Sequence, residues 1–162
     1  MSDLNPAFET DTAKSQKQTA ESFGYKWSLK ESYSSPEMKL AVRDWLYKKY
    51  FDESIAQKRI VLEKNQKKRI LDVGCGAGLS FLSLFDDCLE GNFYTGIDIS
   101  SAVDLCRENF KNLGLNGRFI RQDMFSLDLS EMGLFDLIFS EGVMHHTPSV
   151  ANAIKKLSAF LS

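Results

Sequence analysis

Arg69-Ile-Leu-Asp-Val-Gly-Cys-Gly-Ala-Gly-Leu-Ser80 is the stretch of this sequence that decides its fold. Ile70 to Val73 is a short apolar run with two β-branched residues, which predicts a buried strand. Glycines then occupy alternate positions, and the apolar spacing from Leu79 to Phe85 is that of a helix. A strand, a glycine turn and a helix in this order form the first unit of a nucleotide-binding α/β sheet.

The spacing of the glycines narrows the class of ligand. Gly74, Gly76 and Gly78 let main-chain atoms approach a ligand that a Cβ would exclude, and the helix N-terminus behind them favours an anionic group. The dinucleotide fingerprint requires a glycine at its sixth position, where this chain has Leu79. No Gly-Lys-Ser/Thr follows, so a phosphate-binding P-loop is excluded and a nicotinamide oxidoreductase is disfavoured.

The run Asp72-Val-Gly-Cys-Gly-Ala-Gly78 closely resembles the first motif of class I S-adenosylmethionine-dependent methyltransferases. The resemblance covers about residues 23–162 and is strongest from Ile70 to Pro148. It implies S-adenosyl-L-methionine as the cofactor, with the three glycines beside its methionyl part and Asp72 orienting the loop or the amino group. Cys75 is then expected at the cofactor as a small residue tolerated in a tight loop, and not as a nucleophile.

Asp98 follows the next predicted strand, Phe93 to Ile97, and lies 20 residues beyond Gly78. An α/β nucleotide-binding unit carries its ribose-binding carboxylate at this distance. One carboxylate can accept hydrogen bonds from both ribose hydroxyls. We therefore expect Asp98 to hold the ribose, with Ile99 against the adenine. The alternative is that Asp98 only N-caps the helix that follows.

A third strand is predicted over Arg118 to Gln122, directly before Asp123 and Met124. In the methyltransferase family an acidic residue at this point bonds the adenine amino group, and its neighbour packs on the ring. The resemblance therefore implies an adenine site formed by Gln122, Asp123 and Met124. The alternative is that Asp123 caps a turn at the end of the strand.

The fourth predicted strand, Phe135 to Phe139, leads into Ser140-Glu-Gly-Val-Met-His-His-Thr-Pro148 and resembles the family's fourth motif. The resemblance implies that Ser140 and Glu141 form the floor of the methyl-transfer pocket. DNA and glutamine amino-methyltransferases carry Asn/Asp-Pro-Pro-Tyr/Phe at this point, and this chain does not. Methylation of an exocyclic amine on a flipped base is therefore disfavoured.

His145 and His146 are the only histidines, and both follow the fourth strand. Either could act as the general base for an acidic hydroxyl or amine, and Glu141 is a third candidate. Two adjacent histidines point in different directions, so we expect at most one to face the site. The alternative is a polar loop residue that supports the backbone. No third ligand is spaced to complete a metal site, so no metal is expected.

Three segments are predicted along the chain. Residues 1–22 are polar and form a flexible arm. Residues 23–66 hold the aromatic segment Phe23-Gly-Tyr-Lys-Trp27 and two cap helices, Pro36 to Phe51 and Glu53 to about Glu63. Ser35 is the expected N-cap of the first helix. Its expected apolar stripe, interrupted by Lys49, consists of Val42, Trp45, Leu46 and Tyr50. The aromatic segment either packs on a neighbouring helix or covers the mouth of the site. Residues 67–162 form the cofactor-binding core.

The composition fits one soluble domain of 162 residues with a net charge of −2. No basic field recruits nucleic acid or an acidic membrane. No apolar run is long enough to span a bilayer, and the first residues are not a secretory signal. The three cysteines have neither metal-ligand nor redox spacing. We expect reduced thiols and a cytoplasmic location.

The expected fold is three-layer α/β and Rossmann-like with an N-terminal helical cap, and the resemblance implies a parallel sheet of strand order 3-2-1-4. The family's sheet has seven strands, and only four are counted here, with no sequence left for a fifth. The core is therefore expected to be incomplete. The fourth strand would keep a bare apolar edge, which we expect a second copy of the chain or the N-terminal arm to cover.

The function predicted from the sequence is methyl transfer from S-adenosyl-L-methionine to a small-molecule acceptor by in-line displacement. No basic stripe or stacking series suggests a nucleic-acid partner. The alternative is a cofactor-binding half-domain that is inactive alone and acts as a subunit or binding module.

Overall fold

The structure, a computed structural model, describes Gln18, Glu21, Ser22 and the continuous stretch 35–162. The predictions for the aromatic segment at 23–27, and for nearly all of the arm at 1–22, lie outside the described residues. Within the described part, no helix is long and apolar enough to cross a membrane.

Four parallel strands form one sheet in the order β3-β2-β1-β4, as predicted. They are β1 (Arg69–Val73), β2 (Phe93–Asp98), β3 (Arg118–Arg121) and β4 (Leu137–Phe139). The central strand β1 sets Asp72 opposite Gly96 on one side and Phe139 on the other. The strand order reverses between β1 and β4, and open α/β sheets bind their ligands at the carboxyl ends of the strands beside such a point.

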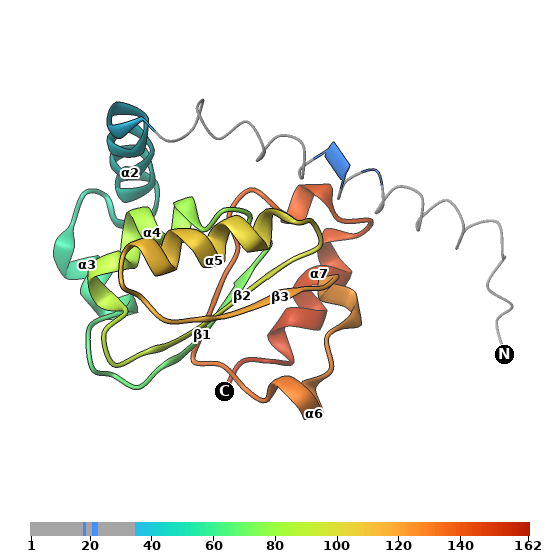
Figure 1. Ribbon diagram of the computed structural model, residues 1–162. Coiled ribbons are helices and arrows are strands. Elements are labelled where there is room, and N and C mark those ends of the chain that lie inside the picture. The colour runs from blue at the N-terminus through green and yellow to red at the C-terminus, as the bar shows by residue number, and fades with distance from the viewer. Residues whose placement is uncertain (1–17, 19–20, 23–34) are drawn as a thin grey trace, which may run out of the picture.

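Helices cover both faces of the sheet (Figure 1). One face packs against α2 (Pro36–Phe51), α4 (Leu79–Phe85) and α5 (Ala102–Asn112). The other packs against α6 (Leu129–Met132) and α7 (Val150–Ser158). Short elements complete the fold: α3 (Ile55–Val61), η2 (Asp86–Cys88), η3 (Met124–Ser126) and η4 (Met144–His146). The predicted three-layer α/β fold is confirmed.

Strand alternation divides the core into two clusters. Successive strand side chains point to opposite faces, so Ile70 packs under α4 and α5 while Leu71 and Val73 pack toward α7. Each cluster is closed by fully buried aromatic rings, such as Phe81 on the first face and Phe160 on the second. The central strands β1 and β2 are therefore buried from both sides, whereas β3 and β4 at the edges are only partly buried.

The cap helix α2 has the bounds that its sequence predicts. The Ser35 hydroxyl accepts the Met38 N–H at 3.2 Å, and Asp52 ends the helix in the left-handed conformation with φ 45°. The prediction that Trp45 and Tyr50 belong to its apolar stripe is wrong. Their exposed fractions are 56% and 41%, whereas Leu46 is fully buried. The buried stripe is narrower than predicted because α2 packs on α4 at the edge of the domain.

The four strands counted in the sequence are the four strands of the described sheet, and the last residues add only a single bridge. After α7, Leu161 forms a parallel bridge with Phe135 at the outer edge of the sheet. The Phe135 N–H donates to the Phe160 carbonyl at 2.7 Å, and the Ser162 N–H donates to the Phe135 carbonyl at 3.0 Å. Phe135 is buried as a result. The pairing is at Phe135, two residues before β4 begins.

Candidate cofactor and acceptor site

One cavity of about 290 Å³ lies at the carboxyl ends of the strands. The loops that follow all four strands line it, together with one residue of the cap helix α2. Predicted site residues that line the cavity are Gly74, Gly76, Asp98, Ile99, Gln122, Asp123, Met124, Glu141 and His146. Segments far apart in sequence thus converge where the sheet topology predicts a ligand.

The loop after β1 is held against the end of β2. The N–H groups of Gly74 and Cys75 both donate to the Ile97 carbonyl, at 2.8 and 2.9 Å. Gly74 has φ +70°, and a Cβ there would lie 2.4 Å from a methyl group of Val143 in the loop after β4. Only glycine combines this backbone conformation with this close approach. The loop therefore leaves main-chain atoms bare on the cavity wall.

Asp98 both lines the cavity and organises the loops around it. One of its carboxylate oxygens accepts the Gly76 N–H at 2.8 Å. The other accepts the Ser100 N–H at 2.8 Å and the Ser100 hydroxyl at 2.6 Å. The alternative in which Asp98 itself caps α5 does not describe these contacts, because Ser101 is the N-cap and has no side-chain capping bond.

Asp123 and Met124 form the cavity wall beyond β3. The Asp123 carboxylate accepts the Phe125 N–H at 3.0 Å, so this residue does cap the short η3 turn. The turn packs Met124 into the second core cluster with its edge at the cavity. Capping and ligand binding are compatible here, since a carboxylate has further acceptor positions.

Glu141, in the loop after β4, contacts the cap helix. The Lys49 ammonium donates to its two oxygens at 3.0 and 3.3 Å, and the Tyr50 hydroxyl donates to Oε2. The hydrogen bond to Glu141 raises the pKa of Lys49. Burial, followed by the same carboxylate, raises the pKa of Tyr50. We call Lys49, Tyr50 and Glu141 the α2 clasp, because they join α2 to the loop beside the cavity.

The two histidines are separated by the geometry as expected, with His146 on the cavity wall and His145 outside it. Their rings lie 3.9 Å apart, centre to centre. Ser140 does not line the cavity either. Its hydroxyl donates to the Val73 carbonyl at 2.9 Å, which ties the loop after β4 to the end of β1.

Asp72 is also absent from the cavity wall, although the sequence suggests that it orients the loop or the cofactor's amino group. Strand alternation points it to the face shared by Ile70 and Tyr94, where the Tyr94 hydroxyl donates to it at 2.7 Å. Burial raises the pKa of Asp72 to about 7. The same burial raises the pKa of Tyr94.

Cys75 and Gly78 of the predicted loop also lie off the cavity wall. Cys75 packs into the first core cluster, and its contact with Cys106 raises the pKa of its thiol. Gly78 begins α4, where a Cβ would lie 2.6 Å from the Cys106 sulfur. Both residues therefore face the first core cluster and not the cavity. All three cysteines of the chain are buried and free.

Sequence reasoning missed several cavity residues. Trp45 was placed in the apolar stripe of α2, and no role was given to Ser80, Phe125, Val143 and Thr147. The sequence did contain one signal, because Lys49 interrupts the apolar spacing of α2. A lysine at a position expected to be buried indicates an acidic partner. The partner itself, Glu141, lies 92 residues away and follows only from the fold.

Comparison with known families decides the identity of this fold. A family model described as a methyltransferase domain matches residues 64–162, which is more than half of the chain. The chain belongs to this family. The sequence resemblance to class I S-adenosylmethionine-dependent methyltransferases is therefore confirmed, and S-adenosyl-L-methionine is the cofactor that this methyltransferase domain is built to bind.

Curated relatives of the methyltransferase domain are longer than the chain itself. A probable cobalt-precorrin-6B C(15)-methyltransferase of Thermoplasma acidophilum is 31% identical over 58% of this chain and 54% of its own length. A ubiquinone biosynthesis O-methyltransferase of Coxiella burnetii is 32% identical over 58% of this chain and 39% of its own length. The chain spans about half the length of the first relative and less of the second.

A solved structure shares the fold over most of the methyltransferase domain. The magnesium protoporphyrin IX methyltransferase of Synechocystis superposes with a TM-score of 0.63, at 18% identity, over 91% of this chain and 68% of its own. At this identity the likeness supports the arrangement of strands and helices.

The cavity of the methyltransferase domain fits the cofactor on its own geometry. The bare backbone at Gly74 is a cradle that a Cβ would fill. Two carboxylates, from Asp98 and Asp123, face a wall with apolar surface from Ile99 and Met124. Carboxylates suit the donor groups of a ribose and of an adenine edge, and apolar side chains suit the faces of the ring.

Proposed function

We propose that this domain transfers a methyl group from S-adenosyl-L-methionine to a small-molecule acceptor by in-line displacement. The observation that carries the proposal is the convergence of Gly74, Asp98 and Asp123 on one cavity at the carboxyl ends of β1, β2 and β3. Each has the residue type that the corresponding part of the cofactor needs. The family match over residues 64–162 supports the same reaction class.

The proposed division of labour follows the order of the strands. Gly74 and Gly76 would face the methionyl part, Asp98 the ribose hydroxyls, and Asp123 with Met124 the adenine. When bound, the cofactor supplies a methyl carbon that its sulfonium already makes electrophilic. No covalent enzyme nucleophile is needed for such a transfer, which agrees with the burial of Cys75.

The chain's own task is then to hold the acceptor in line with that methyl group. Holding reacting atoms about 3–3.5 Å apart converts a bimolecular encounter into an intramolecular step. His146 is the proposed base for an acceptor that must lose a proton, since it lines the cavity and His145 does not. The loops after β1 and β4, joined by the bond from Ser140 to Val73, keep this geometry fixed.

The acceptor is proposed to be a small molecule. The names of the two relatives refer to a cobalt-precorrin and to ubiquinone biosynthesis, with methylation at carbon in one and at oxygen in the other. The net charge of −2 offers no general attraction for a polyanion. The three buried free thiols fit a reducing compartment, which supports a cytoplasmic setting.

The test is calorimetric titration of the 162-residue chain with S-adenosylhomocysteine. Asp98→Ala should bind about tenfold more weakly or worse, a loss of ~1.4 kcal/mol or more. Asp44→Ala, which removes an exposed carboxylate from α2, is the matched control and should bind like the wild type. A wild-type chain that is folded by circular dichroism and does not bind would refute the proposal.

A second candidate, a binding module that is inactive alone, is favoured by the length of the relatives, of which the chain spans only about half. Incubation of the chain with labelled S-adenosyl-L-methionine and an acceptor panel separates the two. Cofactor binding with methyl transfer supports the enzyme. Cofactor binding without transfer to any acceptor in the panel supports the module.

A further inference from the structure

The cavity has a second half that the cofactor residues do not occupy. Asp98, Asp123 and Met124 lie at the ends of β2 and β3, on one side of the glycine loop. On the other side, beyond β1 and β4, the wall consists of Glu141, Val143, His146 and Thr147 from the β4 loop and Trp45 from α2. The group that receives the methyl has to enter from this second side.

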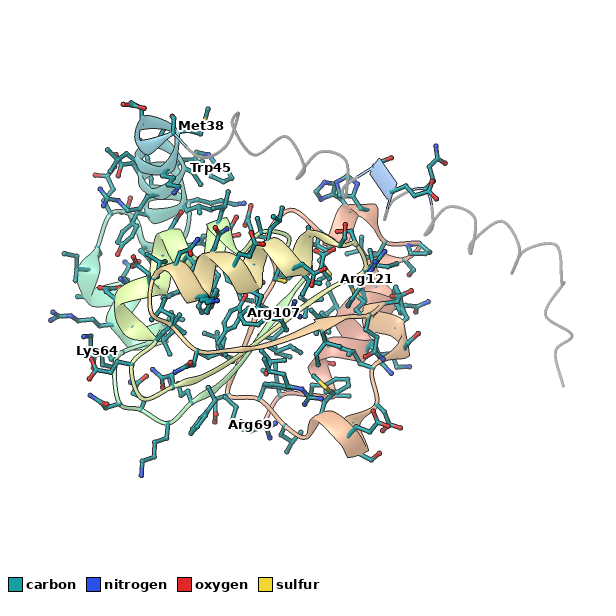
Figure 2. All side chains as sticks on the ribbon, in the orientation of Figure 1. Met38, Trp45, Lys64, Arg69, Arg107 and Arg121 are labelled. Carbon is teal, nitrogen blue, oxygen red and sulfur yellow. The ribbon has the colours of Figure 1, made fainter. Side chains whose placement is uncertain are left out.

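Trp45 is the largest side chain on that wall, and it is exposed among the described residues. The next residue along α2, Leu46, is fully buried and fixes the rotation of the helix. This rotation leaves 56% of Trp45 exposed, and Trp45 lines the cavity. Figure 2 labels its side chain on α2. A large exposed aromatic side chain beside a cavity is typical of a binding surface for an apolar or planar group.

Lys49 holds the indole from its own helix. Its ammonium lies 4.8 Å from the centre of the Trp45 ring, within the range of a cation–π contact, one helical turn further along. The same ammonium donates to both oxygens of Glu141. The indole and the carboxylate are therefore fixed relative to each other by a single side chain.

Glu141 keeps one acceptor position for a ligand. A carboxylate has about four lone-pair positions, and the Lys49 and Tyr50 contacts take one on Oε1 and two on Oε2. Within the described part of the chain this leaves one position on Oε1. Glu141 is also part of the cavity wall, and its side chain is only 11% exposed. A hydroxyl or amine entering the cavity would find a fixed, charged acceptor.

We propose that Trp45 and Glu141 form the acceptor-binding wall, and that the acceptor is a planar aromatic molecule carrying a hydroxyl or amino donor. The ring stacks on Trp45 and the donor binds Glu141 Oε1. Lys49 and Tyr50 are positioning residues that hold the carboxylate. This inference rests on the proposed function, since it assigns the methyl acceptor of the same cavity.

The test uses matched probes on the chain loaded with S-adenosylhomocysteine. Catechol has a planar ring and two donors, 1,2-cyclohexanediol keeps the donors without the planar ring, and 1,2-dimethoxybenzene keeps the ring without the donors. Binding is measured by calorimetry or NMR titration, so no turnover is needed. Catechol should bind about tenfold more tightly than the diol, the size of effect expected from aromatic stacking.

Variants assign each preference to its side chain. Trp45→Ala should abolish the preference for catechol over the diol, and Trp45→Phe should keep it. Leu40→Ala, which removes another exposed apolar side chain of α2, should change neither. Glu141→Gln should reduce the preference for catechol over dimethoxybenzene, because charge-assisted hydrogen bonds are about twice as strong as neutral ones. Lys49→Met should reduce the preference for catechol over dimethoxybenzene as well, and Lys49→Arg should retain it.

The outcomes separate this inference from the proposed function. Failure of the wild type to bind S-adenosylhomocysteine overturns both. The inference alone is overturned if the cofactor product binds while catechol does not bind at millimolar concentration, or binds Trp45→Ala as tightly as the wild type. Equal binding of catechol and the diol overturns it too. Unchanged affinity for S-adenosylhomocysteine in the Trp45 variants, with lost ring preference, supports it.

Discussion

Asp72 shows how a single strand position sets the protonation of a buried group. Its carboxylate is 2% exposed and has the Tyr94 hydroxyl as a hydrogen-bond donor. One neutral donor does not replace the water that an ionised carboxylate loses on burial. Burial therefore raises the pKa of Asp72 from its usual 3.8 to about 7. The folded state favours the protonated acid.

The free energy of unfolding should therefore fall as pH rises through this range. Below pH 3.8 both states carry the proton, whereas between 3.8 and 7 the unfolded chain releases it first, which favours unfolding. Asp72→Asn mimics the neutral acid, so its free energy of unfolding should increase relative to that of the wild type as pH rises. At 1.36 kcal/mol per pKa unit the gain approaches about 4 kcal/mol above pH 7.

Urea unfolding at a series of pH values measures this gain. The informative quantity is the difference in unfolding free energy between Asp72→Asn and the wild type. Asp44→Asn, at an exposed carboxylate, is the control for general charge effects. A difference that stays constant with pH would show that Asp72 is ionised in the folded protein.

Residue roles were predictable from the sequence where they follow from the ends of strands. Asp98 ends one predicted strand and Asp123 directly follows another, so the parallel sheet brings them to one edge, and both line the cavity. Asp72 was assigned to the same site from its motif. Asp72 lies two residues from Ile70 and therefore shares its face of β1, which packs under α4 and α5.

Among the structural elements, the loop after β1 contacts the loop after β4. Gly74 carries φ +70° and faces the methyl groups of Val143. A side chain at this position would be strained twice, by the backbone conformation and by the contact. Strain of the first kind costs about 1–3 kcal/mol in non-glycine residues.

Gly74→Ala should therefore destabilise the fold and weaken the binding of S-adenosylhomocysteine. Gly114→Ala is a matched control, since Gly114 has φ +69° and a Cβ added there would meet no atom within 4 Å beyond its chain neighbours. The control carries only the backbone strain. The double variant Gly74→Ala/Val143→Ala should recover part of the lost binding. Equal losses of stability in the two single glycine variants would rule out the contact with Val143.

Elements were predicted well where a cap and a periodic pattern agree. Ser35 and Pro36 gave the start of α2, and the glycine run gave the turn from β1 to α4. The contacts of α2 could not be predicted, because they depend on Glu141 from a distant loop. Amphipathic spacing identifies a helix, whereas the width of its buried stripe depends on what it packs against.

The whole molecule is a sheet between two apolar clusters, and its last residues belong to the second. Phe160 is 1% exposed, and its carbonyl accepts the Phe135 N–H. The strand order was predictable through the resemblance to the methyltransferase family, which implies this order. The pairing of Leu161 with Phe135 was not predictable, because a single bridge leaves no periodic pattern in the sequence.

Phe160→Ala should lower the unfolding free energy by about 3–5 kcal/mol, the usual cost of removing a buried phenylalanine. Leu161→Ala, next along the chain and 48% exposed, should cost much less. Thermal unfolding measures both, at roughly 2–4 °C per kcal/mol for a domain of this size. Similar shifts for the two variants would contradict the assignment of Phe160 to the core.

The contact between the loops after β1 and β4 makes the two halves of the cavity energetically dependent. Gly74 on the cofactor side touches Val143 on the acceptor side, and Ser140 joins the same loops through Val73. A ligand that fixes one loop lowers the entropic cost of fixing the other. Cofactor and acceptor should then raise each other's affinity by one common factor, within the roughly 5–150-fold span of such couplings.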